Sequence, residues 1–248
     1  MLIPRTHPRA VSLHIRERLV RGYRDGLVVE EGLLAHGRGE MFDYLIGERT
    51  SRASRMAIRA AARMLVEARH PVISVNGNFA ALCPKEIVSL ARVIGAKIEV
   101  NLFYASRKRK RAIAGVLREN GAAEILGLDE RFSRQIPRLD SARRVVDERG
   151  IFIGDVILVP LEDGDRTLAL KKFGKKVITF DLNPMSRTAQ AADVTIVDNV
   201  TRGMGLLVAA CKAAGRRGHG RGGRFDNRKN LSDSVLAIKK NLGRMSDA

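Results

Sequence analysis

Short apolar runs that end abruptly in polar residues recur along the chain from residue 72 onward. They occupy residues 72–75, 98–100, 155–159, 177–180 and 194–197, and they are rich in Val and Ile. Such runs are typical of strands that are buried on both faces of a sheet. Helical segments separate most of them, which predicts an α/β fold with a Rossmann-like, doubly wound parallel sheet.

Helical spacing of apolar residues predicts the remaining elements. In the N-terminal part, Ser12 can cap a helix that runs to about residue 21, and residues 51–68 form an Ala-rich amphipathic helix. Further helices are expected at 85–94, 109–120, 168–173 and 227–242. We therefore predict one domain over residues 1–248, made of an N-terminal helical segment (1–70), a Rossmann-like core (71–210), and a basic linker with a C-terminal helix (216–248).

The most informative stretch follows the run at 177–180, where the chain turns polar and then enters a short helical turn. Ser186 and Thr188 are both suitable N-caps for that turn. In open α/β sheets, ligands bind beyond the carboxyl ends of the strands, and helix N-termini there attract anions. The stretch therefore reads as a nucleotide-binding cradle, although plain Asx turns and helix caps fit the same residues. Its polar members are Asp181, Asn183, Arg187 and Thr188, and then Asp198 and Asn199 after the next strand.

Three other places carry candidate chemistry. In residues 32–40 two glycines flank Arg38, so the backbone could approach a ligand closely, with His36 and Glu40 beside it; a turn between helices with a solvated arginine is the alternative. The strands at 72–75 and 98–100 end in Asn76 and Asn101. The acidic residues at 162–165 could hold Mg²⁺, or could form a solvated turn.

A formal net charge of +18 indicates an acidic partner, either nucleic acid, a membrane surface, or small polyanions such as nucleotides. A basic RNA-binding protein with a Rossmann-like core and an Arg/Gly-rich arm at 216–224 is one hypothesis. Aromatic residues make up only 4% of the chain, which argues against stacking platforms for single strands, so nucleic acid is the less favoured partner. A flexible linker is the other interpretation of the Arg/Gly tract.

Several classes are disfavoured by what the sequence lacks. It contains no GxxxxGK[ST] motif, no Gly-Xaa-Ser-Xaa-Gly motif and no His/Cys cluster, which argues against P-loop ATPases, acyl hydrolases and zinc enzymes. Cys83 and Cys211 have no metal-binding spacing, and no apolar run approaches the roughly 20 residues that span a bilayer. The first residues carry charges where a signal peptide needs apolar ones, so we expect a cytoplasmic protein without a membrane partner.

With these segments in view, the chain resembles the archaeal phosphopantothenate synthetase (4-phosphopantoate–β-alanine ligase) family. The matching stretches cover most of residues 3–205 in family order, and the helix that begins FDNRKNL fits as well. They read IPRTHPRAVSL, LVRGYRDGLVVEEGLLAHGRGEMFDYLIGE, PVISVNGNFAAL, EVNLF, GDVILVPLEDGDRTLAL and KVITFDLNPMSRTAQAADVTIVDN. The chain departs from the expected pattern at Ala105, where relatives should carry Arg, and neighbouring Arg107 could substitute for it.

The resemblance implies a homodimer that makes 4′-phosphopantothenate for coenzyme A synthesis from 4-phosphopantoate, β-alanine and ATP, releasing AMP and diphosphate. It places the ATP contacts on Arg16, Arg38, Asp181, Leu182, Asn183, Arg187, Thr188, Asp198 and Asn199. Because a carboxylate is a poor acylating agent, an acyl-adenylate intermediate is expected, with Mg²⁺ and arginine clamps at the α-phosphate. We assign Arg16, Arg38 and Arg187 to the phosphates. Adenosine is assigned to Asp181, Asn183, Asp198 and Asn199. The acid substrate, the amine or Mg²⁺ is assigned to His36, Asn76, Asn101 and Asp165.

Overall fold

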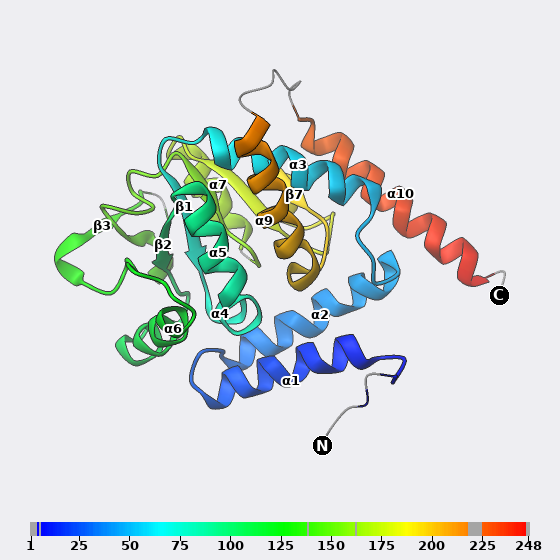
Figure 1. The fold of residues 1–248 in the computed structure, drawn as a ribbon, viewed down its shortest axis with the longest axis horizontal. Coiled ribbons are helices and arrows are strands. Elements are labelled where there is room, and N and C mark those ends of the chain that lie inside the picture. The colour runs from blue at the N-terminus through cyan, green and yellow to red at the C-terminus, as the bar shows by residue number, and fades with distance from the viewer. Residues whose placement is uncertain (1–3, 5, 138, 162, 218–224, 247–248) are drawn as a thin grey trace.

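The computed structural model describes residue 4 and residues 6–137, 139–161, 163–217 and 225–246 (Figure 1). Within these residues, five strands form a parallel sheet in the order β2-β1-β5-β6-β7, and two more form a small antiparallel hairpin. In the sheet, Ile73 in the second strand of this order pairs with Ile98 on one side and Leu158 on the other. The strands are β1 (Pro71–Val75), β2 (Lys97–Val100), β5 (Val156–Leu158), β6 (Lys176–Phe180) and β7 (Val194–Ile196), with β3 (Ser133–Gln135) and β4 (Val145–Asp147) in the hairpin.

Helices surround the sheet and extend from one end of it (Figure 1). Three precede the first strand, namely α1 (Ala10–Arg24), α2 (Glu30–Ile46) and α3 (Arg52–Glu67). Those between strands are α4 (Gly77–Leu82), α5 (Pro84–Ile94), α6 (Arg107–Glu119), α7 (Gly164–Lys172) and α8 (Arg187–Ala191), together with the short 3₁₀ helices η1 (Glu130–Phe132) and η2 (Ala142–Arg144). The chain ends with α9 (Val200–Arg217) and α10 (Asn227–Ser246). No helix within the described residues is both long enough and apolar enough to cross a bilayer.

The core consists of two apolar layers, one on each face of the sheet. Because side chains alternate along a strand, Ile73 and Val75 point to one face and Val72 to the other. The first face packs against α3, α5 and α9. The second packs against α7 and the segment that contains the β3–β4 hairpin. This arrangement confirms the predicted α/β class and explains why the runs are apolar at most positions, with their few polar side chains, such as Ser74 and Thr179, buried as well.

A third apolar cluster lies at the carboxyl edge of the sheet, where α2, α8 and α10 meet. Its buried members include Ile46 of α2, Leu182 after β6, Ala189 of α8 and Ile238 of α10. Asn241 of α10 also donates a hydrogen bond to the Leu45 carbonyl at 3.1 Å. These contacts fix α2 over the ends of the strands.

Two helical regions differ from the sequence-based expectation. For residues 32–40 the two interpretations were a close approach of the backbone to a ligand and a turn between helices; these residues lie inside α2, so the turn was wrong. Glycine costs about 1 kcal/mol per position in a helix, and here the packing of α2 outweighs that cost. No element was expected over residues 200–215, which form most of α9. Gly203 interrupts the apolar pattern of this helix. A larger residue does not fit there, because a Cβ would lie 2.3 Å from the Phe180 ring.

Smaller differences concern helix starts. Helix α1 begins at Ala10, so Ser12 lies inside it rather than capping it. Ser186 is the N-cap of α8 as predicted and accepts a hydrogen bond from the Ala189 amide, whereas Thr188 is the second residue of the helix.

Of the Arg/Gly tract at 216–224, the first two residues continue α9, and residues 218–224 lie outside the described part of the chain.

Candidate functional site

A cleft of about 530 Å³ opens at the carboxyl edge of the parallel sheet. Residues that directly follow β1, β2, β5 and β6 line it, and α2 forms one wall. The order of the strands explains the position of the cleft. The chain passes from β1 outward to β2 on one side and from β5 outward to β6 on the other, so the two connections diverge between β1 and β5. In doubly wound sheets, ligands bind at such a switch point.

Seven of the predicted site residues line this cleft, which brings together segments far apart in the sequence. They are His36 and Arg38 from α2, Asn76 after β1, Asp181, Leu182 and Asn183 after β6, and Thr188 in α8. The others lie elsewhere: Arg16, Asn101, Asp165, Arg187, Asp198 and Asn199 are not among its lining residues.

The turn after β6 forms one end of the cleft. The carboxylate of Asp181 accepts hydrogen bonds from the Asn183 amide at 2.9 Å and from the Ser186 hydroxyl, and Asn183 Oδ1 accepts one from the Met185 amide at 2.9 Å. Burial raises the pKa of Asp181, and these hydrogen bonds oppose the shift. The Asx turns considered from the sequence are therefore present, and the residues that make them also line the cleft.

Helix α2 presents His36, Arg38 and Gly39 to the cleft. Glu30 and Glu31 in its first turn favour the helix dipole, and Gly47 ends it with φ +85°. Gly32 of α2 allows close packing: a Cβ there would lie 2.4 Å from Asn78 Oδ1, and the side-chain amide of Asn78 donates to the Gly32 carbonyl at 2.7 Å. Glycine at this position thus serves helix packing and not a flexible loop.

His36 is one of the titratable residues that α2 contributes to the cleft. Burial lowers the pKa of its imidazole, with Arg16 adding to this effect and Glu40 and Asp43 opposing it. Its Nε2 atom is buried and has no hydrogen-bond partner among the described residues. A neutral imidazole with an open nitrogen can take a proton from a bound amine.

The opposite end of the cleft is cationic. Arg109 of α6 and Arg143 of η2 both line it, together with Phe103 and Asp163. The Arg109 guanidinium donates to the Leu27 carbonyl at 2.9 Å and to the Tyr104 carbonyl, and Arg143 Nη1 lies 3.6 Å from Asp163 Oδ2. Neither arginine was predicted as a site residue. Arg109 was predicted only as the start of a helix over residues 109–120, and Arg143 lies in an irregular segment without a recognisable motif.

Asp198 and Asn199 belong to a buried network outside the cleft. Arg202 of α9 donates to Asp198 Oδ1 at 3.1 Å through Nε and to Asp43 Oδ2 at 3.0 Å through Nη1. The side-chain amide of Asn199 donates a hydrogen bond to the same Asp43 oxygen at 2.9 Å. In this structure the two residues therefore tie the end of β7 to α2 and α9, and contact with adenosine stays a prediction for them.

The remaining predicted residues face other partners. Arg16 pairs with Glu40, whose Oε2 lies 2.9 Å from its Nη2, beside His36. Arg187 and Asp165 are exposed at the starts of α8 and α7. Asn101 is buried, and its side-chain amide donates a hydrogen bond to the Val145 carbonyl at 2.9 Å. Their roles in ligand binding stay predictions.

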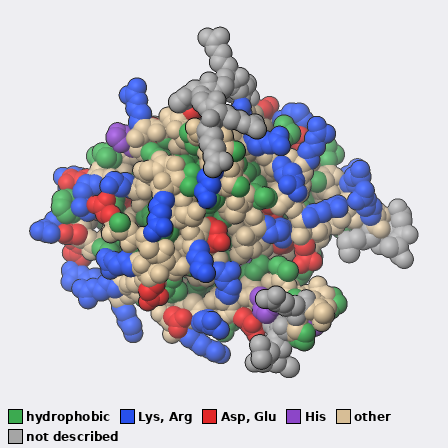
Figure 2. Space-filling view, viewed as in Figure 1, with side chains coloured by type: hydrophobic (Ala, Val, Ile, Leu, Met, Phe, Trp, Pro, Cys, Tyr) green, Lys and Arg blue, Asp and Glu red, His purple; other side chains and the backbone are tan. Residues whose placement is uncertain are grey.

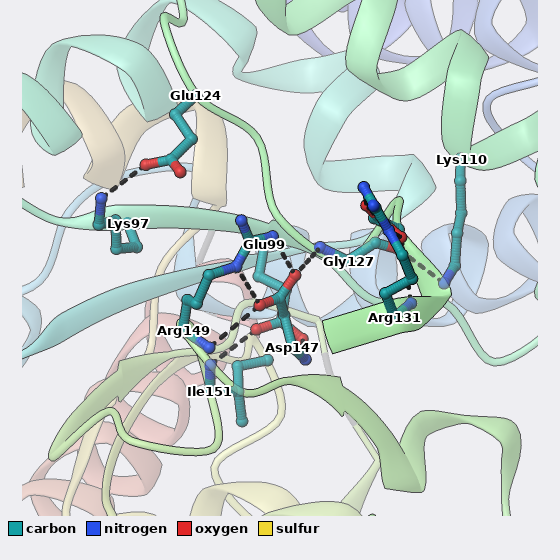
Figure 3. Close-up of polar contacts among 10 residues, drawn as sticks. Lys97, Glu99, Lys110, Glu124, Gly127, Arg131, Asp147, Arg149 and Ile151 are labelled. Atoms are coloured by element: carbon teal, nitrogen blue, oxygen red, sulfur yellow. Dashed lines mark hydrogen bonds and ion pairs between the residues drawn. The ribbon is translucent and has the colours of Figure 1, made fainter. Parts of the chain in front are cut away.

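Glu99 of β2 holds the segment around Asp147 and Ile151, which follows Arg143 along the chain (Figure 3). The Glu99 carboxylate is fully buried and accepts hydrogen bonds from the Asp147 amide at 3.1 Å and from the Ile151 amide at 2.7 Å. Asp147 in turn accepts hydrogen bonds from the Gly127 amide and from the Arg149 side chain. Burial raises the pKa of Glu99 to about 7, partly offset by the two backbone hydrogen bonds.

This raised pKa predicts a pH-dependent stability. Glu99 is expected to titrate near 4.5 when unfolded and near 7 when folded, so its contribution is fully present below 4.5 and is lost as the pH rises to 7. Glu99→Gln should therefore flatten the fall in unfolding free energy between pH 4.5 and 7, by up to about 3 kcal/mol. Urea denaturation across this pH range measures it. Glu124→Gln is the control, because Glu124 is half exposed in its ion pair with Lys97; equal pH profiles for Glu99→Gln and the wild type would contradict the prediction.

The described residues include no group of three or more His, Cys, Asp or Glu side chains that could hold a metal ion. Mg²⁺ usually keeps several waters and binds through one or two carboxylates and substrate phosphates, so such a cluster is not required. Of residues 163–165, the part of the predicted acidic loop that the structure describes, Asp163 lines the cleft and Asp165 does not.

Comparison with known proteins gives a consistent picture. The model of the phosphopantothenate/pantothenate synthetase family matches residues 53–241. A protein of Thermococcus kodakarensis, named 4-phosphopantoate–β-alanine ligase, is 48% identical over 252 residues, which cover 99% of this chain and 95% of that protein. Proteins with the same name from Methanosarcina mazei and Methanospirillum hungatei are 44% and 49% identical, and cover 98% and 85% of this chain and 97% and 85% of their own lengths.

Proposed function

The chain belongs to the phosphopantothenate/pantothenate synthetase family, and from this premise we propose that it joins 4-phosphopantoate to β-alanine with ATP as the energy source. The product, 4′-phosphopantothenate, is a precursor of coenzyme A. The observation that carries the proposal is the cleft at the switch point of the sheet, which gathers seven residues of the predicted ligand set. Relatives named for this reaction match nearly the whole chain, so the comparisons support the ligase and not the RNA-binding alternative.

The face of the molecule shown in Figure 2 does not support the RNA-binding alternative either. On the face shown in Figure 2, Lys and Arg side chains are spread among acidic and apolar ones rather than gathered in one stripe. A nucleic-acid groove requires a continuous basic track that follows the phosphate backbone. The net charge of +18 thus does not by itself indicate such a groove.

The proposed reaction has two steps. A carboxylate oxygen of 4-phosphopantoate attacks the α-phosphorus of ATP, and the bond from that phosphorus to diphosphate breaks. The β-alanine amine, after losing a proton, attacks the acyl carbon, and the bond to the AMP oxygen breaks. Fixed reactant positions can contribute roughly 7–11 kcal/mol to such a reaction, and one positioned hydrogen-bond donor on developing charge about 10²–10³-fold in rate.

The cleft suggests how the described residues share this work. Asp181 and Asn183 lie at the β6 end of the cleft. Their carboxylate and amide groups suit the hydrogen-bond donors of adenosine rather than the phosphates of ATP. Arg38 on the α2 wall is the cleft residue proposed to bind the ATP phosphates, and Arg187 at the start of α8 and Arg16, which pairs with Glu40 of α2, are the further candidates. Asp163 at the rim would serve Mg²⁺, which neutralises phosphate charge when it accompanies ATP.

We further propose a homodimer that forms through the α1–α2 hairpin. The two helices lie side by side at one end of the molecule (Figure 1). Large apolar side chains are exposed on both, including Val11 at 63%, Leu34 at 72% and Met41 at 57%. Exposed apolar residues on adjacent helices suit a contact with a second copy, and α2 would connect that contact to the cleft.

The direct test is formation of the amide. The full-length protein, incubated with ATP, Mg²⁺, β-alanine and 4-phosphopantoate, should give 4′-phosphopantothenate, identified by mass spectrometry, with a rate that saturates in ATP. Omitting any one of the three reactants should abolish the product. Absence of the amide under these conditions would overturn the proposal.

A further inference from the structure

Two asparagines of α10 complete one edge of the parallel sheet. Among the described residues, β7 is the last strand in the order of that sheet, and on its inner side the Ile196 carbonyl accepts a hydrogen bond from the Asp181 amide. Backbone groups of successive residues in a strand alternate between its two sides, so the amide and the carbonyl of Thr195 face outward. Asn227 Oδ1 accepts a hydrogen bond from the Thr195 amide at 2.9 Å, and Asn230 Nδ2 donates one to the Thr195 carbonyl at 2.8 Å. These side chains of α10 therefore take the place of a neighbouring strand.

Asn227 also reaches the short helix α8. Its Nδ2 donates to the carbonyls of Ala189 and Ala192 at 2.9 and 3.0 Å and lies 3.2 Å from Thr195 Oγ1. Thr195 Oγ1 in turn donates to the Ala189 carbonyl at 2.7 Å. The last four carbonyls of a helix have no partner within it, and α8 has only 5 residues. Asn227 and Thr195 thus hold the carboxyl end of a helix that is too short to be stable by itself.

The amino end of α8 is fixed by close packing. Gly164 begins α7, and a Cβ there would lie 2.5 Å from Arg187 Cβ, so the starts of the two helices are in direct contact. Ser186 caps α8 and also donates a hydrogen bond to the Asp181 carboxylate. Contacts at both ends therefore set the orientation of α8, and this orientation places Ser186 and Thr188 in the lining of the cleft.

A side-chain amide matches the partners of Asn227. The group must accept from one backbone amide and donate to two backbone carbonyls, and a planar amide does both. Thr195 and Ala189 are fully buried, so water cannot easily replace the lost partner if Asn227 is removed. A buried polar group that loses its partner is costly, and the end of α8 would shift to reduce that cost.

We propose that Asn227 is a positioning residue for ATP binding and that it acts through α8. The proposal rests on the proposed function, for which Arg187 and Thr188 of α8 are candidate contacts of ATP. Asn227 does not line the cleft. It holds the carboxyl end of α8 while the amino end of the same helix meets the nucleotide. Such support matters because a displacement of about 1 Å at a binding group can cost on the order of 100-fold in rate.

The test measures ATP binding and turnover in the full-length enzyme. Asn227→Ala should raise the Kd for ATP in titration calorimetry, and the KM for ATP, about 5–30-fold, the factor that corresponds to one or two lost hydrogen bonds. The KM for 4-phosphopantoate should change little. Thr195→Val removes the hydroxyl from the same link and should act in the same direction by a smaller factor. This second variant decides the question if Asn227→Ala does not fold.

Asn230→Ala is the matched control, because it removes the other side-chain hydrogen bond from α10 to Thr195. The hydrogen bonds of the Asn230 side chain go to β7 and to Asn227, and none reaches a described residue of α8. The control should lower the midpoint of thermal unfolding, as Asn227→Ala does, and leave the affinity for ATP unchanged.

Two outcomes overturn the positioning role. One is wild-type affinity for ATP in Asn227→Ala and Thr195→Val. The other is equal weakening of ATP binding by Asn230→Ala, which would show that both asparagines only stabilise the fold. Binding weakened by Asn227→Ala and not by the control supports the role even if the wild type forms no amide, a result that would overturn the proposed reaction alone. A wild-type protein that does not bind ATP would contradict both.

Discussion

Replacing His36 with Gln should slow amide formation about 10²–10⁴-fold and leave formation of the acyl-adenylate nearly unchanged. The β-alanine amine enters as an ammonium ion and must lose a proton before it attacks the acyl carbon. His36 suits this task because burial lowers its pKa, so the imidazole is neutral at neutral pH, and its Nε2 is buried without a partner among the described residues. The first step involves no amine and needs no such base.

The two steps can be measured separately. Exchange of labelled diphosphate into ATP, dependent on 4-phosphopantoate, reports the first step, and 4′-phosphopantothenate production reports the overall reaction. His14→Gln is the matched control, since His14 is exposed on α1 and interacts with Glu17. Equal losses in exchange and amide formation would show that His36 binds the first pair of substrates instead. Normal amide formation would exclude it as the base.

Replacing Arg202 with Met should destabilise the protein by about 3–5 kcal/mol. The substitution would leave the carboxylates of Asp43 and Asp198 buried, with side chains only 7% and 0% exposed, and without their shared cation. It would also loosen the link between α9 and α2, the helix that carries His36 and Arg38. Breaking a buried pair costs more than an exposed pair contributes, because the remaining charges are desolvated.

Urea denaturation at neutral pH measures this loss. Lys229→Met is the control, because Lys229 forms an exposed pair with Asp233 one turn away and should change the unfolding free energy by no more than about 0.5 kcal/mol. A change below about 1 kcal/mol for Arg202→Met would mean that water or other groups solvate the two carboxylates, and that α2 is held mainly by its apolar contacts.

Much of the fold could be predicted because its strands are short, β-branched and buried on both faces, a pattern visible in a single sequence. The site could be predicted where it depends on strand ends. Asp181, Asn183 and Asn76 meet at one edge because parallel strands place their carboxyl ends together. Neither inference requires knowledge of contacts between distant segments.

The sequence was less informative where such contacts decide the outcome. No helix was predicted over residues 32–40 or 200–215, and there Gly32 of α2 and Gly203 of α9 permit close packing against Asn78 and the Phe180 ring. Asp198 was predicted as a ligand residue after a strand, and nothing in the sequence indicated that Arg202, one turn later in α9, would pair with it and with Asp43 of α2. Arg143 reaches the cleft only because Asn101 and Glu99 hold its segment, and nothing local in the sequence marks that relationship.

The central claim is that the cleft activates the carboxylate of 4-phosphopantoate as an adenylate before the amine attacks. It is tested most directly with 4-phosphopantoate labelled with ¹⁸O in its carboxylate, incubated with the enzyme, ATP, Mg²⁺ and β-alanine. The adenylate route predicts AMP that carries one ¹⁸O atom, because the acyl–oxygen bond breaks when the amide forms, together with unlabelled diphosphate. ADP and labelled phosphate as the main products would instead indicate an acyl-phosphate and contradict the account.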